Sequence, residues 1–277
     1  GFGTSGMRGM VDAMSPEICF AFTAAFLQQK FRHKFNRVAI AIDLRPSSPE
    51  IARACILAST SLGLEVDFCG VLPTPSLAYY AMQEGIPAVM VTGSHIPFDR
   101  NGIKFYRPDG EISKEDEKAI LSATIQLPEM MQLPELPHVC DSASLRYLER
   151  YTGFLPKGML KDVRIGFYQH SSVARDMLTV LLRRLGAEVV ELRRTDEFVP
   201  IDTEAVSDVD RERGKTWSDE HELDALISTD GDADRPLLGD GLVSHEPDGV
   251  DLDEAVGVQL VEAPLHVHAR QLLLVQR

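Results

Sequence analysis

The sequence has few cysteines and no long apolar run. Its four cysteines form no CxxC pair: Cys19, Cys55, Cys69 and Cys140. This spacing excludes paired-cysteine zinc and redox motifs and favours buried, reduced thiols. No apolar run approaches the roughly 20 residues needed to span a bilayer. No charged segment followed by an apolar stretch opens the chain, so we expect no signal peptide, no membrane partner and a cytoplasmic location.

Basic residues are also scarce. Lys and Arg number 28 against 42 Asp and Glu, so the net charge is −14. An acidic surface repels phosphate backbones, and we therefore expect no nucleic-acid partner. A locally basic site for a small anionic substrate remains compatible with this balance. With 277 residues, 44% of them hydrophobic, the chain has enough material for one large domain or two ordinary ones.

The first half alternates short apolar runs with helical patterns. Three runs are expected to form buried strands: VAIAID at 38–43, EVDFCG at 65–70 and AVMVTG at 88–93. Between them lie a helix that Ser48 would cap and Gly63 would close, and a second helix beginning at Thr74. Strand–helix alternation of this kind is typical of a parallel α/β sheet.

The same pattern returns after the proline-rich segment 127–137. We expect a helix around 142–152, a serine-capped helix at 171–186, a helical stretch through Trp217, and strands at 163–168, 187–192 and 223–229. The prediction is an α/β protein with two similar mixed α/β domains and largely parallel sheets. Their expected bounds are 1–140 and 141–245, and 246–277 is left as an unassigned tail, with an amphipathic helix and a short strand suggested after 241.

An acidic motif, DGDADR, follows the last predicted strand. Asp230, Asp232 and Asp234 repel one another unless a cation neutralises them. Carboxylate oxygens alone favour a hard divalent ion, Mg²⁺ before Zn²⁺. The alternative is a solvated acidic turn. Arg235 comes next and carries a guanidinium suited to a phosphate group.

The stretch VTGSHIP at 91–97 places Ser94 and His95 at the end of a predicted strand. Chemistry in open α/β sheets gathers at the carboxyl ends of strands. A hydrolase nucleophile elbow would read GxSxG, but position 96 is Ile. Adjacent Ser and His side chains also seldom bond to each other, so a plain polar turn is the alternative.

A collection of cations around this serine would favour phosphate chemistry instead. They are Lys104, Arg8 in the glycine-rich opening, and Arg45 after a strand. A hydroxyl among cations and near a divalent ion is suited to carry a phosphoryl group. For Arg45 we favour a structural role.

Four motifs together resemble the α-D-phosphohexomutases, the family of bacterial phosphomannomutases and phosphoglucomutases. They are FGTSGMRG at 2–9, VLPTPSLAYYA at 71–81, VTGSHIPFDRNGIKFYRPDGEI at 91–112 and STDGDADRP at 228–236. The likeness covers about 1–240 with the motifs in the family's order. It implies an intramolecular phosphotransferase that interconverts hexose 1- and 6-phosphates through a phosphoserine enzyme and a hexose 1,6-bisphosphate, with Mg²⁺ as cofactor.

The resemblance also implies roles for individual residues. Ser94 would be the phosphoserine. The three aspartates would hold Mg²⁺ together with a phosphate oxygen on Ser94. Arg8 and Arg235 would bind phosphate, Arg8 also counting among the catalytic residues. Lys104 and His95 would exchange protons with the sugar, Lys104 with a pKa lowered by neighbouring cations. An orienting role is the alternative for His95.

The chain also departs from the family pattern. The sugar-reading loop of the third domain and the phosphate-gripping loop of the fourth are missing, so we expect a chain lacking both domains as written and inactive alone. A truncated, non-catalytic Mg²⁺-binding phosphosugar module and a phosphatase-like hydrolase with an aspartate nucleophile are the alternatives. TGSHIP, rather than the SASHNP style of phosphoglucosamine mutases, favours mannose or glucose phosphates, mannose first. The oligomeric state cannot be read from the sequence.

Overall fold

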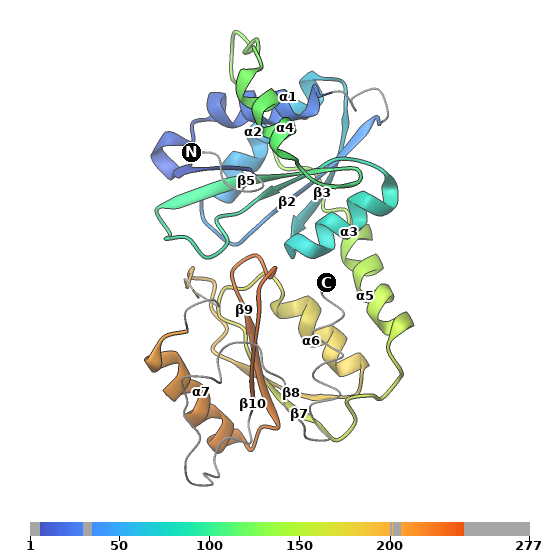
Figure 1. The fold of residues 1–277 in the computed structure, drawn as a ribbon, viewed down its shortest axis with the longest axis vertical. Helices are drawn as coiled ribbons and strands as arrows, with labels where there is room; N and C mark the ends of the chain where they lie inside the picture. The colour runs from blue at the N-terminus through green and yellow to red at the C-terminus, as the bar shows by residue number, and fades with distance from the viewer. Residues whose placement is uncertain (1–5, 30–34, 200, 202–205, 241–277) are drawn as a thin grey trace.

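The computed structural model describes residues 6–29, 35–199, 201 and 206–240. The helix and strand expected after residue 241, and with them the tail 246–277, lie outside the described residues. Two sheets lie one above the other in Figure 1, each with helices packed against it. We call residues 6–122 the first unit and residues 142–240 the second unit.

The first unit contains a six-stranded mixed sheet. Its strands are β1 (Gly6–Met10), β2 (Arg37–Ile42), β3 (Glu65–Val71), β4 (Ala88–Val91), β5 (Arg100–Arg107) and β6 (Gly110–Glu111). β2 pairs in parallel with β3 and with β4, as the strand–helix alternation predicts. β5 then pairs antiparallel with β4, β1 and β6. The sequence analysis did not anticipate these antiparallel strands.

Alternating residues of β2 and β4 bury both faces of this sheet. Val38, Ile40 and Ile42 face a cluster that includes helices α1 (Pro16–Leu27), α2 (Ser48–Ser61) and α4 (Lys114–Ser122). Ala39 and Ala41 face the cluster of α3 (Thr74–Glu84) on the opposite side. Figure 1 shows α1, α2 and α4 above the sheet and α3 below it. A strand buried on both faces explains the continuous apolar run VAIAI.

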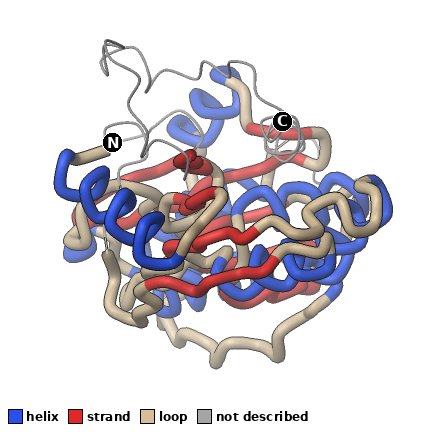
Figure 2. The backbone as a smooth tube through the Cα atoms, turned by 90° about the horizontal axis from the view of Figure 1, so that it is seen from below, coloured by secondary structure: helices blue, strands red, loops and turns tan. Residues whose placement is uncertain are grey.

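The second unit repeats the arrangement with four strands. They are β7 (Arg164–Tyr168), β8 (Glu188–Leu192), β9 (Ala225–Thr229) and β10 (Pro236–Asp240). β7 pairs in parallel with β8 and β9, and β10 closes the edge in antiparallel register. Helices α5 (Ser142–Phe154) and α6 (Arg175–Arg184) pack on one face, and α7 (Asp208–His221) packs through Trp217 on the other. Figure 2 shows strands between helices from below.

Most predicted elements are confirmed, including the α3 start at Thr74 and the irregular segment 127–137. Two details were wrong. Ser48 does not cap α2. Its hydroxyl donates to the buried carboxylate of Asp43 instead, because a buried carboxylate is unfavourable without hydrogen-bond donors. α6 begins at Arg175, four residues later than predicted, because residues 169–172 form a fully buried polar turn.

The cysteines behave as predicted. Cys19, Cys55 and Cys69 are buried free thiols, and Cys140 is partly exposed. Burial raises the pKa of Cys55 to about 12, which keeps it protonated and unreactive. Among the described residues, no helix combines the length and apolar character needed to cross a membrane.

The first core should depend on Phe26, which is fully buried and stacks on Phe105 with ring centroids 4.7 Å apart. Phe26→Ala should lower the free energy of unfolding by about 3–5 kcal/mol, because it leaves a cavity between α1 and the sheet. The matched control is Phe154→Ala, whose ring is 76% exposed. It should change stability by about 0.5 kcal/mol or less. Urea unfolding of both variants measures the difference, and similar midpoints would contradict the expectation.

Candidate functional site

Ser94 lies in the turn that follows β4. Its φ is +50°, a left-handed conformation that costs a non-glycine residue energy, and the residue is only 1% exposed. Its backbone N–H donates to Thr92 Oγ1 at 2.8 Å, which helps to hold the turn. The structure therefore places the predicted serine at a strand end, buried and in a strained backbone.

Asp43 and Arg45, which follow β2, hold this serine turn through hydrogen bonds to its backbone. The Asp43 carboxylate accepts the backbone N–H of Gly93 at 3.1 Å and that of Arg45 at 3.0 Å. Arg45 donates to the carbonyls of Ser94 and Pro97 at 3.1 and 2.7 Å. A Cβ on Gly93 would lie 2.3 Å from the Arg45 guanidinium, so this close packing requires glycine. Arg45 is structural, as expected from the sequence.

The aspartate motif forms the turn after β9. One carboxylate oxygen from each of Asp230, Asp232 and Asp234 lies within 4.8 Å of the others. Asp230 and Asp232 are fully buried. Burial, and then the charges of the other two carboxylates, raise the pKa of Asp230. Three carboxylates this close, two of them fully buried, form a centre of concentrated negative charge.

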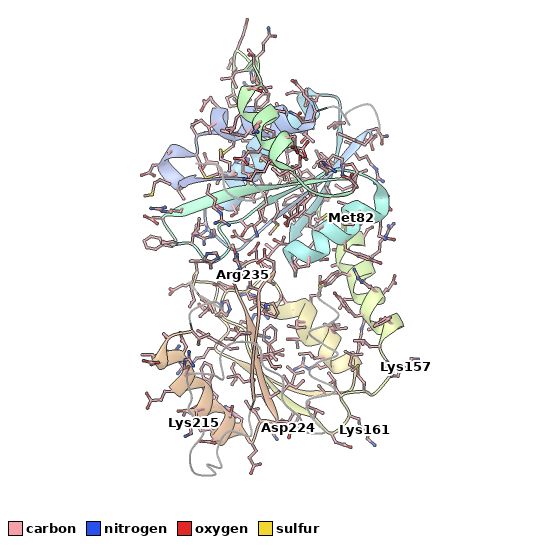
Figure 3. All side chains as sticks on the ribbon, in the orientation of Figure 1. Met82, Lys157, Lys161, Lys215, Asp224 and Arg235 are labelled. Atoms are coloured by element: carbon pink, nitrogen blue, oxygen red, sulfur yellow. The ribbon has the colours of Figure 1, made fainter. Side chains whose placement is uncertain are left out.

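The serine turn and the aspartate turn meet between the two units. Ser94 Oγ donates to Asp230 Oδ2 at 2.7 Å, although the two residues are 136 positions apart. Arg235 Nη1 donates to the same Ser94 Oγ at 2.9 Å. Figure 3 shows Arg235 at the junction, above the end of the second sheet and facing the first. The hydroxyl thus lies between an acidic acceptor and a cation.

His95 joins this cluster. Its Nδ1 lies 2.5 Å from Arg235 Nη1 and 3.4 Å from Ser94 Oγ. Because the Ser94 hydroxyl donates its proton to Asp230, the 3.4 Å approach to His95 is not a hydrogen bond, in agreement with the expectation that neighbouring Ser and His side chains seldom bond. The Arg235 contact requires Nδ1 to act as acceptor.

Lys104, on β5, reaches the aspartate turn from the first unit. Its Nζ lies 2.7 Å from Asp232 and 2.6 Å from Asp234. The predicted lowering of its pKa was wrong. Burial alone would lower the pKa, but the two carboxylates outweigh burial and raise it. Burial alone would raise the pKa of Asp232, but the Lys104 ammonium and hydrogen bonds from Thr74 and Ser94 together outweigh burial and lower it.

Arg8 lies on β1, opposite Gly102 of β5 in the antiparallel register. The same register sets Gly6 opposite Lys104. The structure thus brings the glycine-rich opening to the strand that carries Lys104. Of the predicted residues, it brings Ser94, His95, Lys104, Arg235 and the three aspartates together.

Thr74, at the start of α3, is a contributor that the sequence analysis used only as a helix start. Its Oγ1 donates to Asp232 Oδ2 at 2.6 Å, and its backbone N–H donates to the Asp232 carbonyl at 2.9 Å. Thr74 is part of the motif VLPTPSLAYYA, and its place in that motif was the only indication in the sequence of a role at the site. Lys104 and Thr74 together bring two donors from the first unit to one aspartate.

The turn after β7 supports the aspartate turn from within the second unit. His170 is fully buried, and its Nε2 lies 2.8 Å from the Thr229 carbonyl, one residue before Asp230. Ser172 Oγ lies 2.6 Å from Thr229 Oγ1, and Val173 N–H donates to the Gly231 carbonyl at 3.1 Å. The sequence analysis assigned Ser172 to the serine-capped helix at 171–186 and gave His170 no role, because nothing in the polar QHSS run indicates burial.

The aspartate turn fits a divalent cation. Within the described part of the chain, Asp232 Oδ1 and Asp234 Oδ1 are buried atoms without a hydrogen-bond partner. Such oxygens are costly unless a cation or water satisfies them. The donor set consists of oxygen atoms alone, which suits Mg²⁺. The residues present therefore fit the ion that the motif predicts.

Fold and site together define a class: two-sheet α/β proteins in which a buried, strained serine of one unit meets a carboxylate turn and an arginine of the other. The family described as "Phosphoglucomutase/phosphomannomutase, alpha/beta/alpha domain I" matches residues 1–129. A phosphomannomutase of Salmonella muenchen is 52% identical over 244 residues, which is 86% of this chain and 50% of that protein. A phosphomannomutase of Sinorhizobium fredii is 42% identical over 274 residues, which is 95% of this chain and 57% of that protein.

The resemblance to the α-D-phosphohexomutase family is thereby confirmed, and residues 1–129 match its domain I. The fold agrees as well. A solved structure from Thermus thermophilus, titled a putative phosphomannomutase, superposes with a TM-score of 0.72 at 23% identity, covering 86% of this chain and 56% of that chain. The chain spans about half the length of the curated relatives it matches.

His170 should make stability depend on pH. Burial lowers its pKa from 6.5 to about 4. A depressed histidine pKa means that its stabilising contribution is present above pH 6.5 and is lost as pH falls toward 4. By linkage the loss amounts to about 3 kcal/mol.

The test compares denaturant unfolding of the native protein and His170→Gln between pH 7 and pH 4. The glutamine amide still offers a donor to Thr229 but does not titrate. The native protein should lose more stability than the variant as pH falls. Parallel pH profiles for the two proteins would contradict the assignment.

Proposed function

We propose that this chain carries the phosphoryl-transfer centre of a phosphohexomutase, an intramolecular phosphotransferase that interconverts hexose 1-phosphate and 6-phosphate. The observation that carries the proposal is the position of Ser94 Oγ, 2.7 Å from Asp230 and 2.9 Å from Arg235. A hydroxyl buried between a carboxylate centre and a guanidinium is suited to carry a phosphate. Because the chain spans about half the length of its relatives, the whole activity is stated as a proposal.

Ser94 is the proposed phosphoserine. In the transfer step its Oγ–P bond breaks, a sugar hydroxyl oxygen forms the new bond to phosphorus, the hydroxyl proton passes to a base, and the departing Oγ takes up a proton to become the serine hydroxyl. The product is a hexose 1,6-bisphosphate, which returns its other phosphate to Ser94 after turning over. Such transfers depend on positioning and charge neutralisation, and Arg235 supplies a cation at the serine. We assign a phosphate-binding role to Arg8 as well.

We assign the proton transfers to Lys104 and His95. Lys104 brings an ammonium to the aspartate turn, and His95 brings an imidazole nitrogen within 3.4 Å of the serine oxygen. Both residues belong to the cluster of side chains around the serine turn and the aspartate turn. His95 contacts Arg235 as well, which adds an orienting role.

Asp230, Asp232 and Asp234 are the residues that would hold Mg²⁺. When bound, the ion neutralises charge on the phosphoryl group. The chain's own contribution is to keep three carboxylates close together and to position them against Ser94. Lys104 and Thr74 hold Asp232 in place through two hydrogen bonds of 2.7 and 2.6 Å.

For the substrate we propose a hexose phosphate, mannose phosphate first. Two relatives named phosphomannomutase, 52% and 42% identical, support this choice. The division into domains 1–140 and 141–245 also stands as a proposal. It is consistent with the two sheets and with α5, which packs against both α3 and α6 and so connects the units in Figure 1.

Phosphorylation of Ser94 tests the proposal. After incubation of the 277-residue chain with hexose 1,6-bisphosphate, intact mass should rise by one phosphate, about 80 Da. Peptide mapping should place that phosphate within residues 88–107. Ser94→Ala should remain unmodified, whereas Ser122→Ala, an exposed serine on α4, should behave like the native chain.

The outcome also separates the rival functions. Phosphate release from a hexose phosphate that survives Ser94→Ala would favour an aspartate nucleophile and a hydrolase. A chain that binds the bisphosphate but never becomes phosphorylated would favour a binding module.

Metal binding gives a second test. Asp232→Asn should weaken Mg²⁺ or Mn²⁺ binding to the full chain by at least about tenfold, because it removes a ligand charge from an oxygen-only site. Asp219→Asn, an exposed acidic residue on α7, is the matched control and should bind as the native chain does. Titration calorimetry measures both. Equal affinity in the native chain and Asp232→Asn would remove the aspartate turn as the metal site.

A further inference from the structure

A contact between the units lies beside the site but outside the roles assigned above. The ring of Phe198, from the second unit, covers the guanidinium of Arg45 in the first, with Arg45 Cζ 4.1 Å from the ring centroid. Phe198 follows β8 in a loop with no regular secondary structure. A face-on cation–aromatic contact of this length is attractive because the ring face carries negative charge density.

Phe198 would act on the serine turn through its contact with Arg45. The Arg45 guanidinium donates to the carbonyls of Ser94, Ile96, Pro97 and Arg100, four positions around the serine turn. Arg45 itself is only 1% exposed. Whatever holds this guanidinium in place therefore also holds the turn that carries the serine.

Burial makes the Arg45 cation depend on its partners. Loss of water lowers the pKa of the guanidinium, and Asp43, 3.3 Å from Nε, is its one carboxylate contact among the described ion pairs. The Phe198 ring adds a contact to the guanidinium carbon, 4.1 Å from the ring centroid. The ring therefore supplies favourable charge density where the guanidinium has lost its hydration.

The loop that carries Phe198 is held at both ends by the second unit. Arg175 donates to the Thr195 carbonyl and to Asp196, each at 2.6 Å. Val199 N–H donates to Ser171 Oγ at 2.8 Å. These bonds fix the residues on either side of Phe198, and they therefore help to keep its ring in contact with Arg45.

The same ring also lies against the aspartate turn. A Cβ on Gly231 would lie 3.5 Å from Phe198 Cε2 and 3.1 Å from the Ser94 carbonyl oxygen. Gly231 stands between two of the predicted metal ligands. Phe198 is thus packed at the point where the serine turn and the aspartate turn approach each other.

We propose that Phe198 is a positioning residue: its ring, stacked on Arg45, fixes the serine turn of the first unit against the second unit. The aromatic face is required, not only apolar bulk. The consequence for catalysis rests on the proposed function, but the effect on the serine turn does not.

Hydrogen–deuterium exchange of the 277-residue chain tests this without substrate. Phe198→Leu keeps apolar volume but removes the ring, whereas Phe198→Trp keeps a ring face. Amides of residues 93–100 should exchange at least about threefold faster in Phe198→Leu, and within about twofold of native in Phe198→Trp. Phe154→Leu, which alters a ring 76% exposed on α5, is the matched control and should leave this segment unchanged.

Three results would overturn the proposal: native exchange at 93–100 in Phe198→Leu, equal acceleration in Phe198→Trp, or acceleration that extends equally through β2, which would indicate general destabilisation. The proposed function fails separately. If Ser94 accepts no phosphate but the exchange pattern appears as expected, the positioning role stands and the phosphoryl-transfer role falls.

Discussion

The structure depends on the neutralisation of three carboxylates at one buried point. Asp230, Asp232 and Asp234 crowd a single turn, and two of them are fully buried. Such a charge is tolerable only when cations and donors surround it. The second unit provides one of them, Arg235. Lys104, Thr74 and Ser94 come from the first, so the carboxylates bind the two units together at the place where the proposed chemistry occurs.

The serine turn depends on a different constraint. Its strained backbone must be held in place by the surrounding side chains. Ser94 has a positive φ, and its turn presents carbonyls toward the interior. The Asp43 carboxylate accepts a hydrogen bond from the backbone N–H of Gly93, and the Arg45 guanidinium donates to backbone carbonyls of the turn. The two side chains after β2 therefore satisfy both kinds of backbone group. Backbone strain of this sort persists only where the surroundings over-determine it. The contacts of Arg45 and Asp43 are that surrounding structure.

Much of this could be predicted from local pattern. The buried strands that end near residues 43, 93 and 229 were recognisable from β-branched apolar runs, and the motifs at their ends were recognisable from residue type. The antiparallel strands β1, β5 and β10 were not, because glycine and charged residues dilute their pattern and only pairing with a neighbour stabilises them. His170 was missed for a similar reason, and Ser172 was assigned to the start of a helix. A polar run looks solvated until the fold shows that it is buried.

The sequence by itself determined that the protein is α/β, that a serine and an aspartate motif follow strands, and that the chain resembles the phosphohexomutases, because apolar periodicity and motif spacing are local properties. Only the tertiary structure decided which groups touch. Ser94 and Asp230 are 136 positions apart, yet their side chains share a hydrogen bond. Lys104 was expected among cations and lies between two carboxylates, which reverses the direction of its pKa shift. The charge around a buried group depends on distances of a few ångströms across the interface of the two units, and no pattern along the chain carries those distances.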